Sequence, residues 1–263
     1  MHPSSTDSPP ETASTSTGII GAIPARYAST RLPGKVLRQI AGRTMLEHVY
    51  DRARQAEGLS RVIVLTDDER VAAAVEDFGG EVEMTPAECR SGSDRIAHAA
   101  RAWDAAAVVN IQGDEPLIDP AAISLLARHL ASEPGDPMAT LAAPVEGADF
   151  TNPNVVKVVT DGQGYALYFS RAPIPHGRDG GGSSALRHIG IYGYQREALL
   201  RLADLPPTPL ERAESLEQLR ALENGIAIRV LQVESGWPGV DTMEDLETVE
   251  RLVAAGGGPG TSS

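Results

Sequence analysis

Apolar residues in the first half of the chain form short continuous runs, and amphipathic stretches lie between them. Continuous runs of this length predict strands buried on both faces, and apolar spacings of three and four predict helices. The predicted strands are 19–23, 61–66, a short one around Val82, and 107–111. The predicted helices are 44–56, 69–78, one that Ser93 caps and that runs to Trp103, and 118–130. This alternation predicts an α/β fold with a mostly parallel, twisted sheet and helices on both faces.

The second half of the chain has a different pattern. Residues 155–159 and 165–169 flank a Gly-containing turn and predict a β-hairpin, so that 150–195 forms a smaller β-rich lobe. The Gly- and Ser-rich span 173–185 predicts a mobile loop. The remaining predicted elements are a strand at 187–194, a helix at 210–223, a strand at 226–233 and a last helix at 242–253.

We expect one domain over 18–255 with a loose tail at each end. Segment 1–17 is rich in Ser, Thr and Pro, and segment 256–263 is rich in Gly and Ser, so both are predicted to be disordered.

The composition of the 263-residue chain allows a sizeable core and excludes several classes of function. Hydrophobic residues make up 41% of the sequence, but no apolar run approaches the ~20 residues that span a membrane. The formal net charge of -13 argues against general affinity for nucleic acid, which requires a basic surface. The single cysteine, Cys89, excludes an intramolecular disulfide, and the N-terminus lacks secretory features. These features predict a cytoplasmic protein.

Three cations lie close together in the loop that follows the first predicted strand. Arg26, Arg31 and Lys35 belong to the segment Pro24–Lys35, which also holds small hydroxyl residues and Gly34. Ligands of an open α/β sheet bind just beyond the carboxyl ends of its strands. The segment lacks the first Gly and the final Ser or Thr of a P-loop, and the three glycines of the Rossmann fingerprint are absent. We therefore expect a loop that cradles a triphosphate or a pyrophosphate in another way.

Two carboxylates are candidates for binding a cation beside that anion. Asp114 follows the predicted strand 107–111, so it is expected at the same edge of the sheet as the cationic loop. Mg²⁺ typically binds through one or two carboxylates and phosphate oxygens. Asp241 precedes the last predicted helix and is either a second ligand or an N-cap of that helix.

Eight segments, in order along the chain, resemble those of a known family. They are Pro24–Lys35, Ser91–Arg95, Asn110–Pro116, Asn152–Val159, Tyr165–Arg171, Arg187–Tyr194, Leu216–Arg220 and Gly239–Thr242. Together they resemble the 3-deoxy-manno-octulosonate cytidylyltransferases, the CMP-Kdo synthetases, over residues 19–253. The resemblance implies a Rossmann-like nucleotidyltransferase fold.

The resemblance also implies an activity and a set of residues. The implied enzyme transfers CMP from CTP to the anomeric hydroxyl of Kdo, a 2-keto-3-deoxy sugar acid, for lipopolysaccharide biosynthesis, and releases pyrophosphate. The implied cofactor is Mg²⁺, held by Asp114 and Asp241, which act in catalysis with Arg26 and Lys35. The implied CTP contacts are Ala25, Arg26, Ser29, Arg31, Lys35, Ser91, Gly92, Arg95 and Gln112. The implied acceptor pocket consists of Arg171, His188, Tyr192, Glu217 and Gln218. The family implies a homodimer built by the β-rich lobe.

The identity of the acceptor stays open at this point. Segment 175–185 is short and Gly-rich and lies near the implied acceptor residues, so another ulosonic acid or a phosphonate is an alternative to Kdo. A protein that binds nucleotide or sugar without catalysis is a second alternative. Glu217 and Gln218 are neighbours on one predicted helix and project about 100° apart, so at most one of them points squarely into a pocket.

Overall fold

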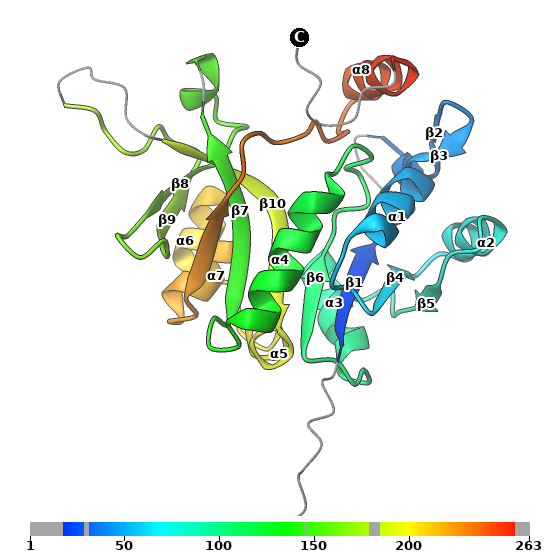
Figure 1. Ribbon diagram of the computed structural model, residues 1–263, viewed down its shortest axis with the longest axis horizontal. Coiled ribbons are helices and arrows are strands. Elements are labelled where there is room, and N and C mark those ends of the chain that lie inside the picture. Colours follow the sequence, from blue (N-terminus) through cyan, green and yellow to red (C-terminus); the bar gives the residue numbers. More distant parts are fainter. Residues whose placement is uncertain (1–17, 29–31, 146, 179–184, 256–263) are drawn as a thin grey trace, which may run out of the picture.

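The computed structural model describes residues 18–28, 32–145, 147–178 and 185–255. Among these residues, nine strands form one twisted sheet with helices on both sides (Figure 1). Seven strands follow the order β11-β7-β10-β6-β1-β4-β5, and β8 and β9 extend the sheet from β10. The strands are β1 (Ile19–Pro24), β4 (Arg61–Thr66), β5 (Val82–Met84), β6 (Ala107–Asn110), β7 (Met138–Pro144), β8 (Lys157–Thr160), β9 (Ala166–Ser170), β10 (Leu186–Gln195) and β11 (Ile228–Gln232). A separate small hairpin pairs β2 (Gln39–Ile40) with β3 (Arg43–Thr44).

The helices divide between the two faces of the sheet. Apolar side chains of α1, α2, α4 and α8 belong to one hydrophobic cluster, and those of α3, α5 and α7 belong to the other. The helices are α1 (Met45–Gln55), α2 (Glu69–Asp77), α3 (Gly92–Ala100), α4 (Pro120–Ser132), α5 (Arg196–Ala203), α6 (Pro209–Glu214), α7 (Gln218–Glu223) and α8 (Met243–Ala254), with the short 3-10 helices η1 (Lys35–Leu37) and η2 (Gly147–Phe150). No helix among the described residues is long and apolar enough to cross a membrane.

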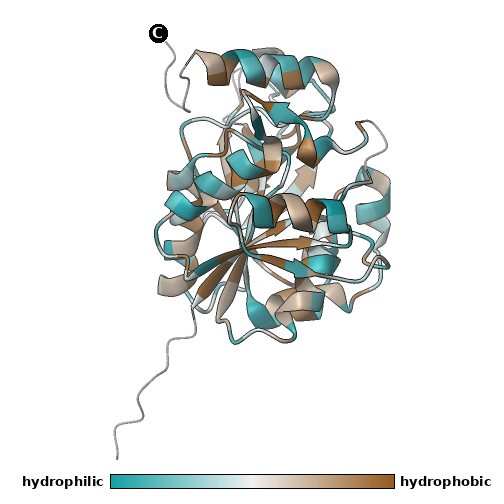
Figure 2. Ribbon diagram, turned by 90° about the vertical axis from the view of Figure 1, so that its right-hand side faces the viewer, coloured by the Kyte–Doolittle hydropathy of each residue, from teal (hydrophilic) through white to brown (hydrophobic). Residues whose placement is uncertain are grey.

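The first strand explains why the apolar runs predicted strands buried on both faces. Ile19 and Ile23 belong to the cluster beneath α1 and α4, whereas Ile20 and Ala22 belong to the cluster beneath α3. Successive side chains of a strand point to opposite faces, so a strand covered on both sides requires a continuous apolar sequence. Figure 2 shows the result, with brown strands between helices whose colours alternate.

Strand order places a crevice at the carboxyl end of β1. This strand pairs in parallel with β4 on one side and with β6 on the other. The connection to β4 and the later connection to β6 therefore lead to opposite sides of β1. The loops that follow β1 and β6 therefore separate at this point, which is where open α/β sheets bind ligands. The segments Pro24–Lys35 and Ile111–Asp114 begin here.

The β-rich segment continues the main sheet. Strands β8 and β9 form the predicted antiparallel hairpin, and β8 pairs with the start of β10, at Leu186 and Arg187. Farther along, β10 runs antiparallel between β6 and β7. Hydrogen bonds thus join this lobe to the strands that carry the crevice. Of the mobile loop predicted at 173–185, residues 179–184 lie outside the described residues.

The prediction of one helix over 210–223 was wrong. The structure has α6 and α7 instead, separated at Ser215, which adopts a left-handed conformation with φ of 53°. A non-glycine residue with this conformation ends a helix, and its sequence alone carries no strong signal for it. The break turns α7 away from the axis of α6.

Three further differences between prediction and structure concern the ends of α3 and α4 and two elements that were not predicted. Helix α3 is capped by Ser91, whose Oγ accepts a hydrogen bond from Asp94 N, so the predicted Ser93 cap and the extension to Trp103 were wrong. Helix α4 begins at Pro120, two residues after the predicted start, because Asp119 caps it. The sequence reasoning missed β7 and α5, although the turn signal Pro134-Gly135-Asp136-Pro137 directly precedes the apolar run of β7.

Candidate active site

The loop after β1 is folded back on itself and anchored in the core. The N–H of Gly34 donates to the carbonyl of Tyr27 at 3.0 Å, and Gly34 has a φ of 66°, which favours glycine. Leu32 and Val36 are buried on either side of Lys35. The loop therefore holds Lys35 in a fixed place and directs its side chain away from the core. Ser29 and Arg31 lie outside the described residues.

The ammonium of Lys35 lies between two carboxylates from distant parts of the chain. Its Nζ donates to Asp114 Oδ2 at 2.6 Å, to Asp241 Oδ1 at 3.2 Å and to the Val240 carbonyl at 2.8 Å. Burial lowers the pKa of Lys35, but the two carboxylates outweigh this effect and hold the pKa above its usual value. Lys35 is therefore a charged ammonium, and Asp114 and Asp241 converge on the position of a cation.

Tertiary contacts bring Asp241 to this position. The N–H of Val240 donates to the carbonyl of Asp114 at 2.9 Å, and Trp237 Nε1 donates to Glu115 Oε2 at 2.6 Å. The interpretation of Asp241 as the N-cap of the last helix was wrong. Thr242 caps α8, in a capping box with Asp245.

A cleft of about 350 Å³ opens around the Lys35 ammonium. Arg26 lies in its wall, where its guanidinium also donates to the carbonyl of Cys89 and so joins the loop after β1 to the loop before α3. Two glycines leave little room for a side chain, because a Cβ at Gly92 would lie 3.0 Å from the Pro24 ring and one at Gly113 would lie 3.2 Å from the Pro24 carbonyl. The lining residues are Pro24, Arg26, Ala28, Lys35, Val36, Gly92, Gln112, Gly113, Asp114 and Asp241.

A second, smaller pocket of about 150 Å³ adjoins the cleft. Gly92 and Gln112 line both hollows, so they form the partition between them. The other lining residues are Ser93, Asn110, Met138, Tyr192, Tyr194, Leu202, Glu217 and Gln218. The structure thus brings Gln112 together with three residues of the implied acceptor pocket. Glu217 and Gln218 both line it because Glu217 is the N-cap of α7 rather than a residue within a helix.

Burial governs the titration of the second pocket. It raises the pKa of the Glu217 carboxyl, although a hydrogen bond from Ser93 and the charge of Arg220 oppose the rise. Burial also raises the pKa of Tyr192 and Tyr194. The two phenols are therefore neutral hydroxyl groups at physiological pH and offer hydrogen bonds rather than charge.

Some residues of the implied site line neither the cleft nor the second pocket, among them Ala25, Arg95, His188 and Arg171. Ala25 is fully buried and donates its N–H to Leu65 O. Arg95 is also fully buried, with its guanidinium near Thr85 Oγ1 and 3.1 Å from Asp67 Oδ1.

His188 and Arg171, the other two of these residues, lie outside the second pocket and contact the residues around it. His188 packs its ring against those of Phe169 and Tyr192, and its Nε2 lies 2.9 Å from Thr140 Oγ1. Arg171 donates from its guanidinium to the carbonyls of Glu214 and Pro153. Neither residue lines the pocket itself. Ser91, besides capping α3, lines a third hollow on the far side of Glu217.

Comparisons with known proteins agree with this geometry. A family model described as cytidylyltransferase matches residues 20–229. A 3-deoxy-manno-octulosonate cytidylyltransferase of Solibacter usitatus is 55% identical over 239 residues, which cover 90% of this chain and 95% of that protein. The chain belongs to the 3-deoxy-manno-octulosonate cytidylyltransferase family. A further member, from Myxococcus xanthus, is 52% identical and covers 91% of this chain and 98% of its own.

Solved structures confirm the predicted fold of this cytidylyltransferase. A CMP:2-keto-3-deoxy-manno-octonic acid synthetase complexed with CTP superposes with a TM-score of 0.89 at 44% identity, covering 91% of this chain and all of the other. A cytidylyltransferase from Leptospira borgpetersenii has a TM-score of 0.60 at 19% identity, which shows a shared fold alone. The resemblance predicted from the eight segments is confirmed at the level of the family.

The donor set of this cytidylyltransferase fits a divalent cation that also binds phosphate. No group of three or more His, Cys, Asp or Glu side chains in the described part of the chain forms a complete metal cage. The two carboxylates of Asp114 and Asp241 nevertheless share one cation, the Lys35 ammonium. Mg²⁺ keeps several waters and usually takes one or two carboxylates with substrate phosphates, so two are sufficient.

Sequence reasoning missed several residues of this site. Asn110 and Tyr194 line the second pocket, and the Glu115–Trp237 hydrogen bond holds the segment before Asp241. Asn110 carried a usable signal, because it is a polar residue at the end of an otherwise apolar strand. Trp237 carried none, since only the folded chain brings it to Glu115.

Proposed function

We propose that this protein transfers the cytidylyl group of CTP to the anomeric hydroxyl of 3-deoxy-manno-octulosonate (Kdo) and releases pyrophosphate. Family members about half identical to it bear the name of that activity, and a similar structure was solved with CTP. The observation that carries the proposal is the pair of adjoining hollows, one with cations and carboxylates and one with hydroxyl and amide groups beside the Glu217 carboxyl. Such a pair suits a triphosphate beside a polyhydroxylated acceptor.

The cleft around Lys35 suits the triphosphate. Attack of the acceptor oxygen on the α-phosphorus forms one P–O bond and breaks another, and negative charge accumulates on the phosphate oxygens and the leaving pyrophosphate. Arg26 and Lys35 line this cleft and can neutralise the charge, Lys35 once its ammonium is released from Asp114 and Asp241. Such electrostatic stabilisation is typically the largest contribution to a reaction of this kind. Gln112, in the partition, can orient the reacting groups of both substrates.

The second pocket suits the sugar acid. Glu217 and Gln218 offer acceptors and donors for its hydroxyl groups, and the neutral phenol of Tyr192 offers another. Arg171 is the proposed partner of the acceptor carboxylate. To reach it, the guanidinium has to leave the carbonyls of Glu214 and Pro153.

We also propose that the reaction requires Mg²⁺, which Asp114 and Asp241 would hold. When bound, the metal would supply positive charge to the phosphate oxygens and to the leaving pyrophosphate. The proposal is supported by the two carboxylates that converge on one cation. Because Mg²⁺ and the Lys35 ammonium would compete for these carboxylates, binding of the metal would free the ammonium to approach the phosphates.

The setting of the enzyme is likewise a proposal. We propose a cytoplasmic protein, a homodimer built by the β8–β9 lobe, in a pathway that supplies activated Kdo to lipopolysaccharide. The family and the exposed Leu167 on β9 support the dimer.

The experiment is pyrophosphate release by the purified protein with CTP, Mg²⁺ and Kdo. We expect release with CTP and Kdo, and little with ATP, GTP or UTP. Release with CTP and another ulosonic acid or a phosphonate, but not with Kdo, would reassign the acceptor. CTP binding by calorimetry without release for any acid would show a binding protein and overturn the enzymatic proposal.

A further inference from the structure

Both carboxylate oxygens of Glu214 hold the end of strand β9. Oε1 accepts a hydrogen bond from Ser170 Oγ at 2.6 Å, and Oε2 accepts one from Arg171 N at 2.9 Å. The main-chain carbonyl of Glu214 also accepts from Arg171 Nε at 2.9 Å. Burial raises the pKa of Glu214, but the hydrogen bonds outweigh this effect and hold the pKa below its usual value, so the carboxylate is charged. The two carboxylate bonds thus anchor the end of α6 to the end of β9, whereas the bond to Arg171 Nε is the one that the guanidinium leaves to reach the acceptor.

The residues that follow Glu214 form one wall of the smaller pocket. Ser215 has the left-handed conformation that ends α6, Leu216 is buried, and Glu217 and Gln218 then line the pocket opposite Tyr192. Only three positions separate Glu214 from Glu217. A shift of the Glu214 anchor therefore moves Glu217 and Gln218 directly.

No such path leads from Glu214 to the larger cleft. The cleft is lined by the loops after β1 and β6 and by the segment that ends at Asp241. None of these residues makes a hydrogen bond to Glu214 among the described contacts, and Gln112 and Gly92 stand between the two hollows. The anchor is thus specific to one of the two substrates.

We infer that Glu214 is a positioning residue for the acceptor: by fastening the α6–α7 break to β9, it sets Glu217 and Gln218 at the distance from Tyr192 that the sugar acid requires. This inference rests on the proposed function, because the smaller pocket is taken as the acceptor site. Hydrogen bonds to a charged group are among the stronger ones in proteins, and the loss of two of them is sufficient for a change of about tenfold in binding. Loss of the anchor is therefore large enough to measure as an altered KM.

The test compares Glu214→Ala with Glu214→Gln in steady-state kinetics, with Kdo and CTP varied in turn. We expect Glu214→Ala to raise the KM for Kdo about tenfold or more and to leave the KM for CTP within about twofold. Glu214→Gln is expected to restore most of the KM for Kdo, because its amide can accept from Arg171 N and donate to Ser170 Oγ. Ser170→Ala removes one bond only and serves if Glu214→Ala does not fold, with a smaller rise in the KM for Kdo alone.

Glu223→Ala is the matched control. Glu223 also joins α6 to α7, through Leu210 N at 3.1 Å, but it is exposed and, among the described hydrogen bonds, donates to and accepts from no residue of β9; only its charge acts on Tyr168. Its substitution is expected to leave both KM values unchanged. Equal rises in both KM values, no rise for Kdo, or a Gln variant as impaired as the Ala variant would overturn the inference. A wild-type protein without pyrophosphate release would instead overturn the proposed function.

Discussion

Lys35 Nζ lies 2.6 Å from Asp114 Oδ2, and this ion pair joins the loop after β1 to the loop after β6. Asp241 completes the arrangement from the segment before α8. Because a cation already stands between the two carboxylates, their mutual repulsion is offset in the protein without substrate. The same arrangement is suited to exchange that ammonium for a metal bound to a triphosphate.

Substitution of Asp241 distinguishes a role in binding the metal from a role in capping α8. Asp241→Asn is expected to lower Mg²⁺-dependent turnover at least about 100-fold, or ~3 kcal/mol in activation free energy, because an amide is a poor ligand for the metal. Its free energy of unfolding should stay near that of the wild type, since Thr242 caps α8. Initial rates against Mg²⁺ concentration and urea unfolding measure the two effects.

Two neighbouring variants serve as controls for Asp241. Thr242→Ala should lower the free energy of unfolding by about 1 kcal/mol through loss of the cap. Glu244→Ala removes an exposed acidic residue of the same helix turn and should change neither property. Full turnover in Asp241→Asn would exclude Asp241 as a metal ligand.

Trp237→Phe tests the hydrogen bond that holds the segment before Asp241. Burial raises the pKa of Glu115 to about 7, and the Trp237 N–H opposes this rise. Loss of the donor leaves Glu115 less favourably buried, so we expect a loss of ~1–3 kcal/mol in stability. We also expect a higher Mg²⁺ concentration at half-maximal rate, because Asp241 is held less firmly.

Trp103→Phe is the control for that experiment. Trp103 Nε1 donates to Glu83 Oε2 at 2.9 Å, the same kind of bond, but neither residue lines the cleft. It should cost comparable stability and leave the Mg²⁺ requirement unchanged. If both variants shift the Mg²⁺ requirement equally, the effect is general loosening rather than a displaced Asp241.

Because the His188 ring is buried, we expect the folded protein to lose stability in acid. Burial lowers its pKa to about 3, whereas the unfolded chain binds the proton near pH 6.5. Because the unfolded state binds more protons between these values, the folded state loses stability as the pH falls. At ~1.36 kcal/mol per pH unit, this amounts to about 2 kcal/mol between pH 7 and pH 5.

Urea unfolding at several pH values measures this dependence. His188→Gln should remove about 2 kcal/mol of the difference between pH 7 and pH 5. His98→Gln, at an exposed position on α3, should retain the wild-type dependence. An unchanged pH dependence in His188→Gln would show that other groups control acid stability.

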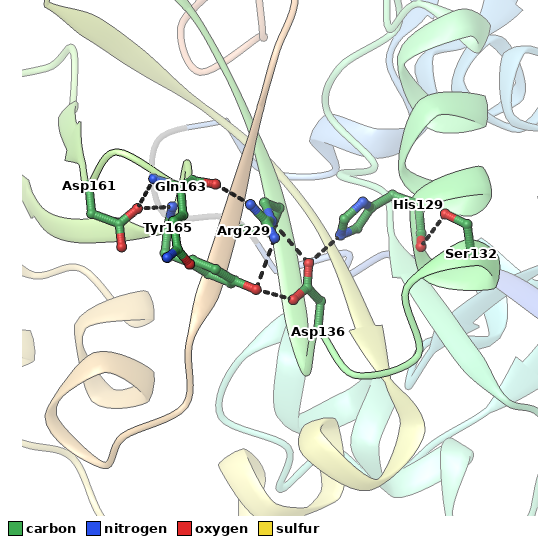
Figure 3. A network of polar contacts seen from close by, with 7 residues as sticks. All are labelled: His129, Ser132, Asp136, Asp161, Gln163, Tyr165 and Arg229. Carbon is green, nitrogen blue, oxygen red and sulfur yellow. Dashed lines mark hydrogen bonds and ion pairs between the residues drawn. The ribbon is translucent and has the colours of Figure 1, made fainter.

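Asp136 is the centre of a network that contributes to stability far from the cleft (Figure 3). Its carboxylate accepts from His129 Nε2 at 2.8 Å, Tyr165 OH at 2.5 Å and Arg229 Nε at 3.0 Å. The network fastens the β8–β9 turn and β11 to the start of β7, at the edge of the sheet opposite the cleft. Asp136→Ala leaves three donors without an acceptor and should cost about 3 kcal/mol of stability.

Kinetics distinguish this structural role from a catalytic one. The KM for CTP of Asp136→Ala should match that of the wild type at a temperature where the variant is folded, because no residue of the network lines the cleft. Ser132→Ala, which removes only a hydroxyl bonded to the His129 carbonyl, is a control with little expected change in stability. A raised KM for CTP in the folded Asp136→Ala protein would connect the network to the cleft.

Local patterns were sufficient for much of the fold. The continuous run 19–23 predicted β1, because both faces of that strand are covered, and the apolar spacing of 44–56 predicted α1. Prediction failed where a local signal was weak or overridden. At Ser215, hydrogen bonds from β9 to Glu214 hold a left-handed residue that ends the helix. For β7, a turn signal at 134–137 precedes the run 138–144, but three of the residues in that run are Ala, which is a weak indicator of a strand.

Sequence patterns were enough to identify the cationic loop, the buried strands and, through eight ordered motifs, the family. These features depend on residues close together in the chain. Three facts came from the folded chain alone: Asp241 joins Asp114 at Lys35, Glu217 and Gln218 line one pocket, and Arg95 is fully buried. Those facts depend on contacts between distant segments, whose free energies arise only when the sheet and its helices pack together.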